Sequence, residues 1–221
     1  MKTRILLAAA LAAAPLTAVS APRPWTAIAT PVATGSYVIG NPKARVRLVE
    51  VVSYTCPHCA HLVAEAKPDV TRMVQSGVLA IEVRNQIHDK LDLVAASLAR
   101  CAGPAPFPAL HEALFAKQGE WVPQGMEWDQ DNAQRLAFYS DDQKLKALAE
   151  GAGLTALAKA AGASDAAIDA CFSGDAVQRT LAVSQTTEAA KGTPSFYLNG
   201  KLIENVTWAQ LKPMLAGAGA K

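Results

Sequence analysis

The sequence predicts an α/β fold that is interrupted by a large all-α insertion. Segments rich in β-branched or alternating apolar residues lie on both sides of the insertion, at 46–54, 78–87 and 194–203. Residues 89–191 between them are Ala-rich and have helical periodicity. Hydrophobic residues make up 51% of the 221-residue chain and charged residues 18%, so the chain can bury a substantial core.

The N-terminus has the three parts of a secretory signal peptide. Residues 1–4 form a short basic start, residues 5–19 are an apolar run, and small residues follow at 20 and 21. The run is shorter than the roughly 20 residues that span a bilayer, which favours a cleaved signal peptide over residues 1–21 rather than an anchor. Its removal lowers the count of Lys and Arg from 21 to 19, equal to the 19 Asp and Glu. This balance gives no indication of a nucleic-acid partner.

The first strand is predicted after a short lead-in. Residues 22–34 contain three prolines among small residues, which indicates a flexible or extended segment. Residues 46–54 are almost entirely apolar, as in a central strand that is buried on both faces. The only charge in the inner half of that strand is Glu50.

A helix and a second strand complete the first part of the α/β unit. Residues 59–75 are mostly helix formers, although Pro68 is expected to interrupt and kink the helix. Residues 78–87 alternate between apolar and charged side chains, as in a strand. We therefore assign residues 22–88 to the first part of this unit.

The rest of the chain divides into the helical insertion and a second α/β part. Within the insertion at 89–191, glycines and prolines separate an expected four to six helices. The second α/β part, 192–221, contains a hairpin around Asn199 and Gly200. Thr207 is expected to cap a last helix that ends near residue 215.

The chemistry is expected at Cys56-Pro57-His58-Cys59, where the first strand meets the first helix. Pro57 suits the first turn of a helix, because that position needs no N–H donor. Cys56 then lies at the helix N-terminus, where unpaired N–H groups and the helix dipole favour a negative sulfur. Such a position lowers a thiol pKa, and His58 would lower it further if it is cationic or donates a hydrogen bond. A stable thiolate is also a good leaving group, so the disulfide of this pair would be a strong oxidant.

Two other interpretations of this cysteine pair remain open. A C-x-x-C motif is often half of a zinc site, and a metal carrier would use Cys56, Cys59 and a histidine. The pair would alternatively be a purely structural disulfide, although a strand-to-helix corner has fixed geometry without one. Metal analysis of the reduced protein would identify a carrier.

The residues quoted above, together with a late Thr193-Pro194 before a hairpin strand, resemble the DsbA family of bacterial periplasmic disulfide oxidoreductases. The resemblance runs from about residue 40 to residue 215. It implies a thioredoxin-like mixed sheet with an inserted helical domain. It also implies chemistry by the cysteine pair alone, with no metal and no cofactor.

The resemblance also implies a role for each site residue. Cys56 would be the exposed nucleophile and Cys59 its buried resolving partner, with Pro57 and His58 tuning the redox potential. Glu50 would be a buried acid that relays a proton to Cys59; the alternative is an ordinary Glu at the edge of the sheet.

Three further implications concern the late loop and the second pair of cysteines. Pro194 would be cis, although most X–Pro bonds are trans and the sequence alone does not indicate cis. Thr193 would offer its backbone to an extended substrate. Because relatives carry a similar pair, Cys101 and Cys171 would form a structural disulfide; two buried free thiols are the alternative.

We therefore expect a periplasmic dithiol oxidase that introduces disulfides into unfolded or reduced exported proteins. A membrane quinone-linked oxidase would restore its disulfide. Thr193 also occurs at this position in isomerases and reductases of the wider superfamily, so the direction of the reaction stays open. An isomerase usually needs a dimerisation domain, for which residues 22–40 are too short, and we expect a monomer.

Overall fold

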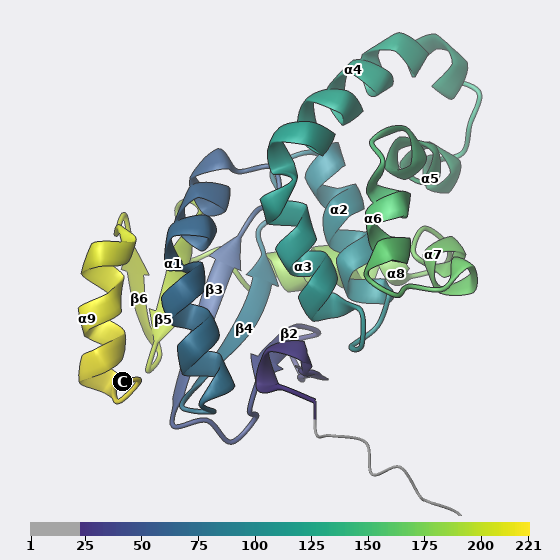
Figure 1. Cartoon of the computed structure of the whole chain (residues 1–221). Coiled ribbons are helices and arrows are strands. Elements are labelled where there is room, and N and C mark those ends of the chain that lie inside the picture. Colours follow the sequence, from purple (N-terminus) through teal and green to yellow (C-terminus); the bar gives the residue numbers. More distant parts are fainter. Residues whose placement is uncertain (1–22) are drawn as a thin grey trace, which may run out of the picture.

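A mixed sheet of six strands forms the centre of the computed structural model, which describes residues 23–221 (Figure 1). The predicted signal peptide lies outside these residues. The strand order is β1-β2-β4-β3-β5-β6, and β3 and β4 are parallel while all other neighbours are antiparallel. The strands are β1 (Ala29–Pro31), β2 (Tyr37–Gly40), β3 (Val46–Val52), β4 (Leu79–Asn85), β5 (Ser195–Leu198) and β6 (Lys201–Glu204). The predicted α/β class with a mixed sheet is therefore confirmed.

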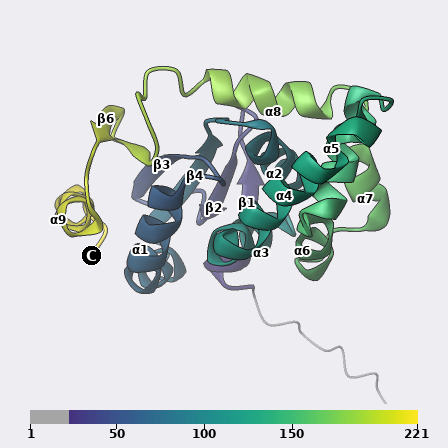
Figure 2. The same ribbon diagram turned by 90° about the horizontal axis from the view of Figure 1, so that it is seen from above.

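Helices cover both faces of the sheet and form a lobe at one side of it. In Figure 2, α1 and α3 lie on one side of the sheet and α8 runs along the other side. The helices α2 to α7 gather beside the sheet (Figure 1). The helices are the 3-10 helix η1 (Trp25–Ala27), α1 (Pro57–Gln75), α2 (Lys90–Cys101), α3 (Phe107–Ala116), α4 (Gln118–Leu136), α5 (Asp141–Gly151), α6 (Leu154–Ala160), α7 (Asp165–Ala170), α8 (Ala176–Gln185) and α9 (Trp208–Ala218).

Two details of the predicted elements are wrong, and two short strands were not predicted. The helix α1 continues through Pro68 instead of being interrupted there, while a kink at this position stays a prediction. Pro68 has no N–H to donate to the carbonyl oxygen one turn earlier, and because Pro68 is exposed, that oxygen lies near solvent. The insertion contains seven helices rather than four to six, because Gly153 and Gly162, both with positive φ, separate the short helices α6 and α7 from their neighbours. The lead-in contributes the edge strand β1, which pairs with an unpredicted strand, β2.

The last hairpin and helix follow the predicted pattern closely. Strands β5 and β6 are antiparallel and are joined at Asn199 and Gly200, both with positive φ. Thr207 caps α9 in a capping box with Gln210. The helix ends at Ala218, three residues beyond the predicted end.

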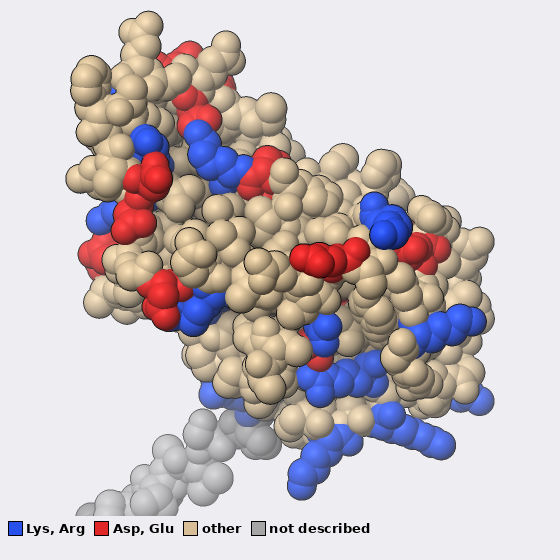
Figure 3. All heavy atoms as spheres, turned by 180° about the vertical axis from the view of Figure 1, so that it is seen from behind, with Lys and Arg blue, Asp and Glu red and all other residues tan. Residues whose placement is uncertain are grey.

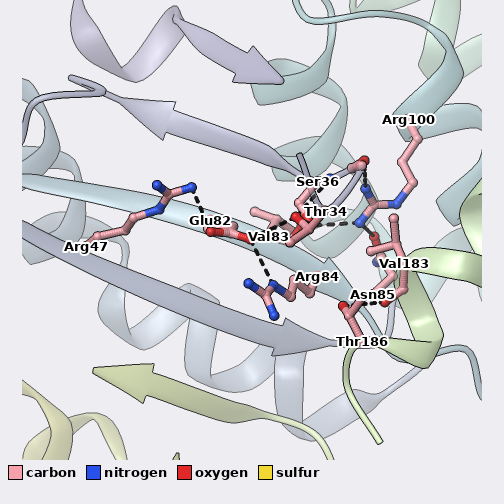
Figure 4. A network of polar contacts seen from close by, with 11 residues as sticks. Thr34, Ser36, Arg47, Glu82, Val83, Arg84, Asn85, Arg100, Val183 and Thr186 are labelled. Carbon is pink, nitrogen blue, oxygen red and sulfur yellow. Dashed lines mark hydrogen bonds and ion pairs between the residues drawn. The ribbon is translucent and has the colours of Figure 1, made fainter. Parts of the chain in front are cut away.

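One hydrophobic core runs through the sheet and the helical lobe. A buried polar network also connects the helical lobe with the sheet (Figure 4). Arg100 at the end of α2 donates hydrogen bonds to the carbonyl oxygens of Gly35 and Val83 and to the side chain of Asn85. Because most of these partners lie in or next to the sheet, this guanidinium fixes the helical lobe against it. The division of the chain at residues 88 and 191 stays a prediction.

A second group of polar contacts surrounds Glu82 on strand β4 (Figure 4). The carboxylate of Glu82 is buried and pairs with Arg47 at 2.7 Å and with Arg84 at 2.8 Å. Buried charges are tolerated when they are paired in this way. In the β3–β4 register Glu82 is opposite Val49, the neighbour of Glu50 on β3. The side chains of Glu82 and Glu50 therefore lie on opposite faces of the sheet.

Surface charges on the helical lobe are balanced by nearby partners. Lys146 pairs with Asp169 at 2.7 Å and Lys159 pairs with Asp165 at 2.6 Å. Seen from behind, Lys and Arg lie among Asp and Glu over this lobe, and basic side chains gather at the lower edge of the molecule (Figure 3). Among residues 23–221, no helix combines the length and apolar character needed to span a membrane.

Candidate active site

The two cysteines of the motif lie at the start of α1, directly after the central strand β3. Cys56 is the N-cap residue with extended backbone, and Pro57 occupies the first turn. The side chains of Pro57 and His58 are exposed, and Cys59 is completely buried as expected. The expectation that Cys56 is exposed is wrong: it is only 7% exposed, because the Thr193 segment packs against its sulfur. Both thiols are free in this structure. The strand therefore delivers Cys56 to the helix N-terminus, with Cys59 one helical turn deeper.

The pKa values of the two thiols move in opposite directions. The pKa of Cys56 is lowered to about 5, mainly because the thiol of Cys59 donates a hydrogen bond to its sulfur. The side chain of Thr193 and the backbone N–H groups of His58 and Cys59 lower it further, against the effect of burial. The pKa of Cys59 is raised, because its proton is held between the two sulfurs and its side chain is buried. Near neutral pH these shifts favour a reduced pair whose negative charge is on Cys56.

The late Thr-Pro segment faces this sulfur. The Thr193–Pro194 peptide bond is cis, and the carbonyl oxygen of Thr193 lies 3.3 Å from the sulfur of Cys56. Ser195, the next residue, begins β5 and pairs with Val51 of β3. Because β5 is hydrogen-bonded to the strand that leads to Cys56, the sheet itself brings the two distant segments together.

An open groove of about 460 Å³ adjoins the cysteines. Its lining includes His58 and His61 of α1, together with Thr193 and Pro194. The segment from Glu204 to Trp208, which links β6 to α9, also contributes to the lining. An extended polypeptide entering this groove would pass beside Cys56.

Glu50 is a buried acid on the central strand. Its side chain is 7% exposed, and β3 lies between β4 and β5 rather than at an edge of the sheet. It lines a cavity of about 130 Å³ that is enclosed mainly by apolar side chains, including Leu62 and Phe196. Burial raises the pKa of Glu50 to about 7, so its carboxyl group exchanges a proton near neutral pH. A proton relay from this acid to Cys59 stays a prediction.

Several residues that support the active-site turn were not found from the sequence. Asp92 of α2 is fully buried and accepts hydrogen bonds from the N–H groups of Tyr54 and His88, at 2.8 Å and 3.0 Å. Gln118 of α4 donates to the carbonyl oxygens of Tyr54 and Cys56. These residues lie in the helical lobe, 33 or more positions after Cys59 in the chain, and no local motif marks them.

His111 has a packing role. It lies buried on α3, and its Nδ1 atom is 3.0 Å from the hydroxyl of Tyr54. Burial lowers the pKa of His111 to about 4, so the ring is neutral near pH 7.

The other two cysteines lie away from the motif, in the helical lobe. Cys101 at the end of α2 and Cys171 after α7 form a disulfide, with their Cα atoms 5.4 Å apart. No group of three or more His, Cys, Asp or Glu side chains within residues 23–221 is arranged to hold a metal ion.

Comparison with known proteins places this geometry in a family. A family model described as thioredoxin matches residues 33–216. A protein of Rickettsia typhi named as a protein-disulfide oxidoreductase is 33% identical over 175 residues, which are 76% of this chain and 56% of that protein. A Rickettsia conorii protein with the same name is 32% identical, over 74% of this chain and 53% of the relative. The chain thus spans little more than half the length of these curated relatives.

Solved structures extend the comparison. A protein-disulfide isomerase from Novosphingobium aromaticivorans is 33% identical, with a TM-score of 0.73 over 85% of this chain and 100% of that one. The α-DsbA1 protein of Wolbachia pipientis shares the fold at 15% identity, with a TM-score of 0.63 over 83% of this chain and 90% of that one. BdbD of Bacillus subtilis does so at 22% identity and a TM-score of 0.56, over 86% of this chain and 96% of that one. The chain belongs to the thioredoxin family, with the DsbA-like fold of its thiol–disulfide oxidoreductases.

Proposed function

We propose that this protein is an exported dithiol oxidase that transfers the disulfide of Cys56 and Cys59 to reduced proteins. The observation that carries the proposal is the position of Cys56 as the N-cap of α1, where its pKa is lowered, one helical turn from Cys59, whose pKa is raised. A thiol that is stable as an anion leaves easily, and a disulfide that contains it is easily reduced. The pair is therefore suited to accepting electrons from substrate thiols.

The reaction proceeds in two thiol–disulfide exchanges. A substrate thiolate attacks the sulfur of Cys56 in the disulfide form, which breaks the bond to Cys59 and forms a mixed disulfide. The second thiol of the substrate then attacks the substrate sulfur that is bonded to Cys56. The mixed disulfide breaks, and Cys56 leaves as a thiolate. Two electrons pass from the substrate to the enzyme, and the substrate gains a disulfide. Glu50 supplies the proton that Cys59 takes up.

The substrates are unfolded or reduced exported proteins, which bind as extended chains. The support is the groove lined by Thr193 and Pro194, together with the carbonyl oxygen of Thr193, which lies 3.3 Å from the sulfur of Cys56. The signal-like segment at residues 1–21 supports a periplasmic location. A membrane quinone-linked oxidase would reoxidise the enzyme, because the periplasm is kept oxidising by such a chain.

Alkylation of Cys56 as a function of pH tests the proposal. We expect iodoacetamide to label Cys56 of the reduced protein with an apparent pKa near 5, while the buried Cys59 stays unlabelled. Equilibration with glutathione should then give a potential closer to about −120 mV than to the about −270 mV of thioredoxin. Labelling of Cys56 only above about pH 8, as for an ordinary thiol, would refute the oxidase.

A disulfide isomerase is the second candidate. It is favoured by the name of the Novosphingobium relative, which is 33% identical over the whole of its length. An isomerase must hold scrambled substrates, so it would reactivate scrambled ribonuclease at rates comparable with its oxidase activity and would form a stable dimer in gel filtration. A monomer that oxidises reduced ribonuclease but does not reactivate the scrambled form supports the oxidase.

A further inference from the structure

We infer that Gln118 is a positioning residue, through which the helical lobe holds the Cys56 turn in the conformation that stabilises the thiolate. The inference rests on the proposed function, since it concerns the same sulfur. Gln118 is the first residue of α4 and is 8% exposed. It lies 62 positions from Cys56 in the chain, and its side chain donates to the backbone of the turn rather than to the sulfur.

The side-chain amide of Gln118 spans the turn between β3 and α1. Its Nε2 atom donates to the carbonyl oxygen of Tyr54 at 2.8 Å and to that of Cys56 at 2.9 Å. An amide nitrogen has two N–H donors, so both are used on this one turn. Both carbonyl groups are buried, and neither can exchange this donor for bulk water without movement.

The carbonyl of Cys56 also begins the helix. It accepts the N–H of Ala60 at 3.3 Å, which is a long hydrogen bond for a first helical turn. The N–H groups of His58 and Cys59, in that same turn, stabilise the sulfur of Cys56. Gln118 therefore fixes the peptide group whose orientation decides how the first turn presents its donors to the sulfur.

The donor is itself held firmly. Trp121, one turn further along α4, donates its indole N–H to the carbonyl oxygen of Leu114 in α3 at 2.8 Å. This bond fixes the corner between the two helices, and α3 packs beside α1 (Figure 1). A rigid corner allows the Gln118 amide to act as a fixed support rather than as a flexible side chain.

Tyr54 receives matching support from two other helices. Its N–H donates to Asp92 of α2 at 2.8 Å, and its hydroxyl lies 3.0 Å from His111 of α3. With Gln118 at the carbonyl oxygen, each polar group of this fully buried residue has a partner in the lobe. Three helices thus hold the residue that comes two positions before the reactive cysteine.

Replacement of Gln118 by Met tests the inference, because Met has a similar size and cannot donate. We expect the pKa of Cys56, measured from the ultraviolet absorbance of the thiolate, to rise by about one unit in the variant. The equilibrium constant for reduction of the enzyme by glutathione should fall by up to about tenfold, which corresponds to about 30 mV.

The matched control is Gln124→Met in the same helix. Gln124 also donates its side-chain amide to a backbone carbonyl, that of Gly151 at 2.8 Å, but it is exposed and its acceptor lies at the end of α5 rather than in the turn. We expect this variant to keep the Cys56 pKa and the glutathione equilibrium of the unmodified protein. If both variants shift the pKa equally, the effect comes from general loosening of the lobe, and the inference is wrong.

The remaining outcomes separate this inference from the proposed function. An unmodified protein with an ordinary Cys56 pKa overturns both. A low Cys56 pKa that does not change in a folded Gln118→Met variant overturns the positioning role alone. If that variant does not fold, Gln118→Asn, whose amide is one methylene shorter, should raise the pKa in the same direction, and an unchanged pKa there is equally decisive.

Discussion

The buried acid Glu50 should make the protein less stable as the pH rises through neutrality. Its carboxyl group lies on the central strand in a cavity with mainly apolar walls, and no other charge is among the causes of its altered pKa. Replacing Glu50 by Gln keeps the size of the side chain and removes the ionisation. The difference in stability between the two proteins then isolates the cost of charging this one group.

The magnitude follows from the pKa of Glu50 in the two states. Burial raises that pKa from the ordinary value of 4.5 to about 7 in the folded protein. The folded state therefore binds a proton that the unfolded state has released between these two values. Below pH 4.5 the group costs nothing, and the loss of stability grows until the pH passes about 7. The full loss is about 3 kcal/mol, since each pKa unit is worth about 1.4 kcal/mol.

Urea unfolding followed by circular dichroism measures this effect. The experiment uses a Cys56→Ser/Cys59→Ser background, so that the redox pair cannot change state while the second disulfide stays intact. Between about pH 5 and about pH 8, Glu50→Gln should gain about 2–3 kcal/mol relative to the protein that retains Glu50. Ile81→Val, which lines the same cavity, is the control and should cost about 1 kcal/mol at both values of pH.

Parallel pH profiles for the proteins with and without Glu50 would refute the reasoning. They would mean that the carboxyl group ionises as freely in the folded protein as in the unfolded chain. A difference of the opposite sign would mean that the ionised form has a partner in the folded state. An equal pH dependence in Ile81→Val would assign the effect to the cavity as a whole and not to Glu50.

Two further predictions concern the helical lobe. Changing Cys101 and Cys171 to Ala removes a disulfide between residues 70 positions apart and should cost about 2–4 kcal/mol, measured from the urea midpoint. An unchanged midpoint would contradict this. Gly151→Ala places a methyl group against the ring of Trp128 and should cost about 1–3 kcal/mol in thermal unfolding. Gly119→Ala, whose new methyl group meets nothing within 4 Å, should be neutral or slightly stabilising, and an equal loss there would show that the clash is not the cause.

The sheet could be predicted where its strands have a local signal. The strand at β3 is a long apolar run that is buried on both faces, and the hairpin of β5 and β6 has a two-residue turn with a strong preference for Asn-Gly. By contrast, β1 and β2 are only three and four residues long, with β1 at the edge of the sheet and β2 between β1 and β4. Segments this short form strands because a neighbouring strand pairs with them, which a single sequence does not show.

The active site divides in the same way. The motif residues Cys56 and Cys59 were found because the spacing and the helix start are local properties of the chain. The supporting residues Asp92 and Gln118 were missed, since their role depends on where the helical lobe packs against the turn. A polar side chain in a helix has many alternative uses, and only the folded structure shows which carbonyl or N–H group it meets.

The two thiols of the motif differ in their need for a proton. They are the same chemical group one helical turn apart, yet the pKa of Cys56 is lowered and that of Cys59 is raised. In the proposed cycle, Cys56 leaves as an anion without help, whereas Cys59 must gain a proton when the disulfide opens and lose it when the disulfide forms again. Because Cys59 is completely buried, its sulfur cannot exchange a proton directly with solvent. A carboxyl group that titrates near pH 7 can both give and take that proton, so a cost of about 3 kcal/mol in stability at Glu50 is expected for an enzyme and not for a purely structural domain.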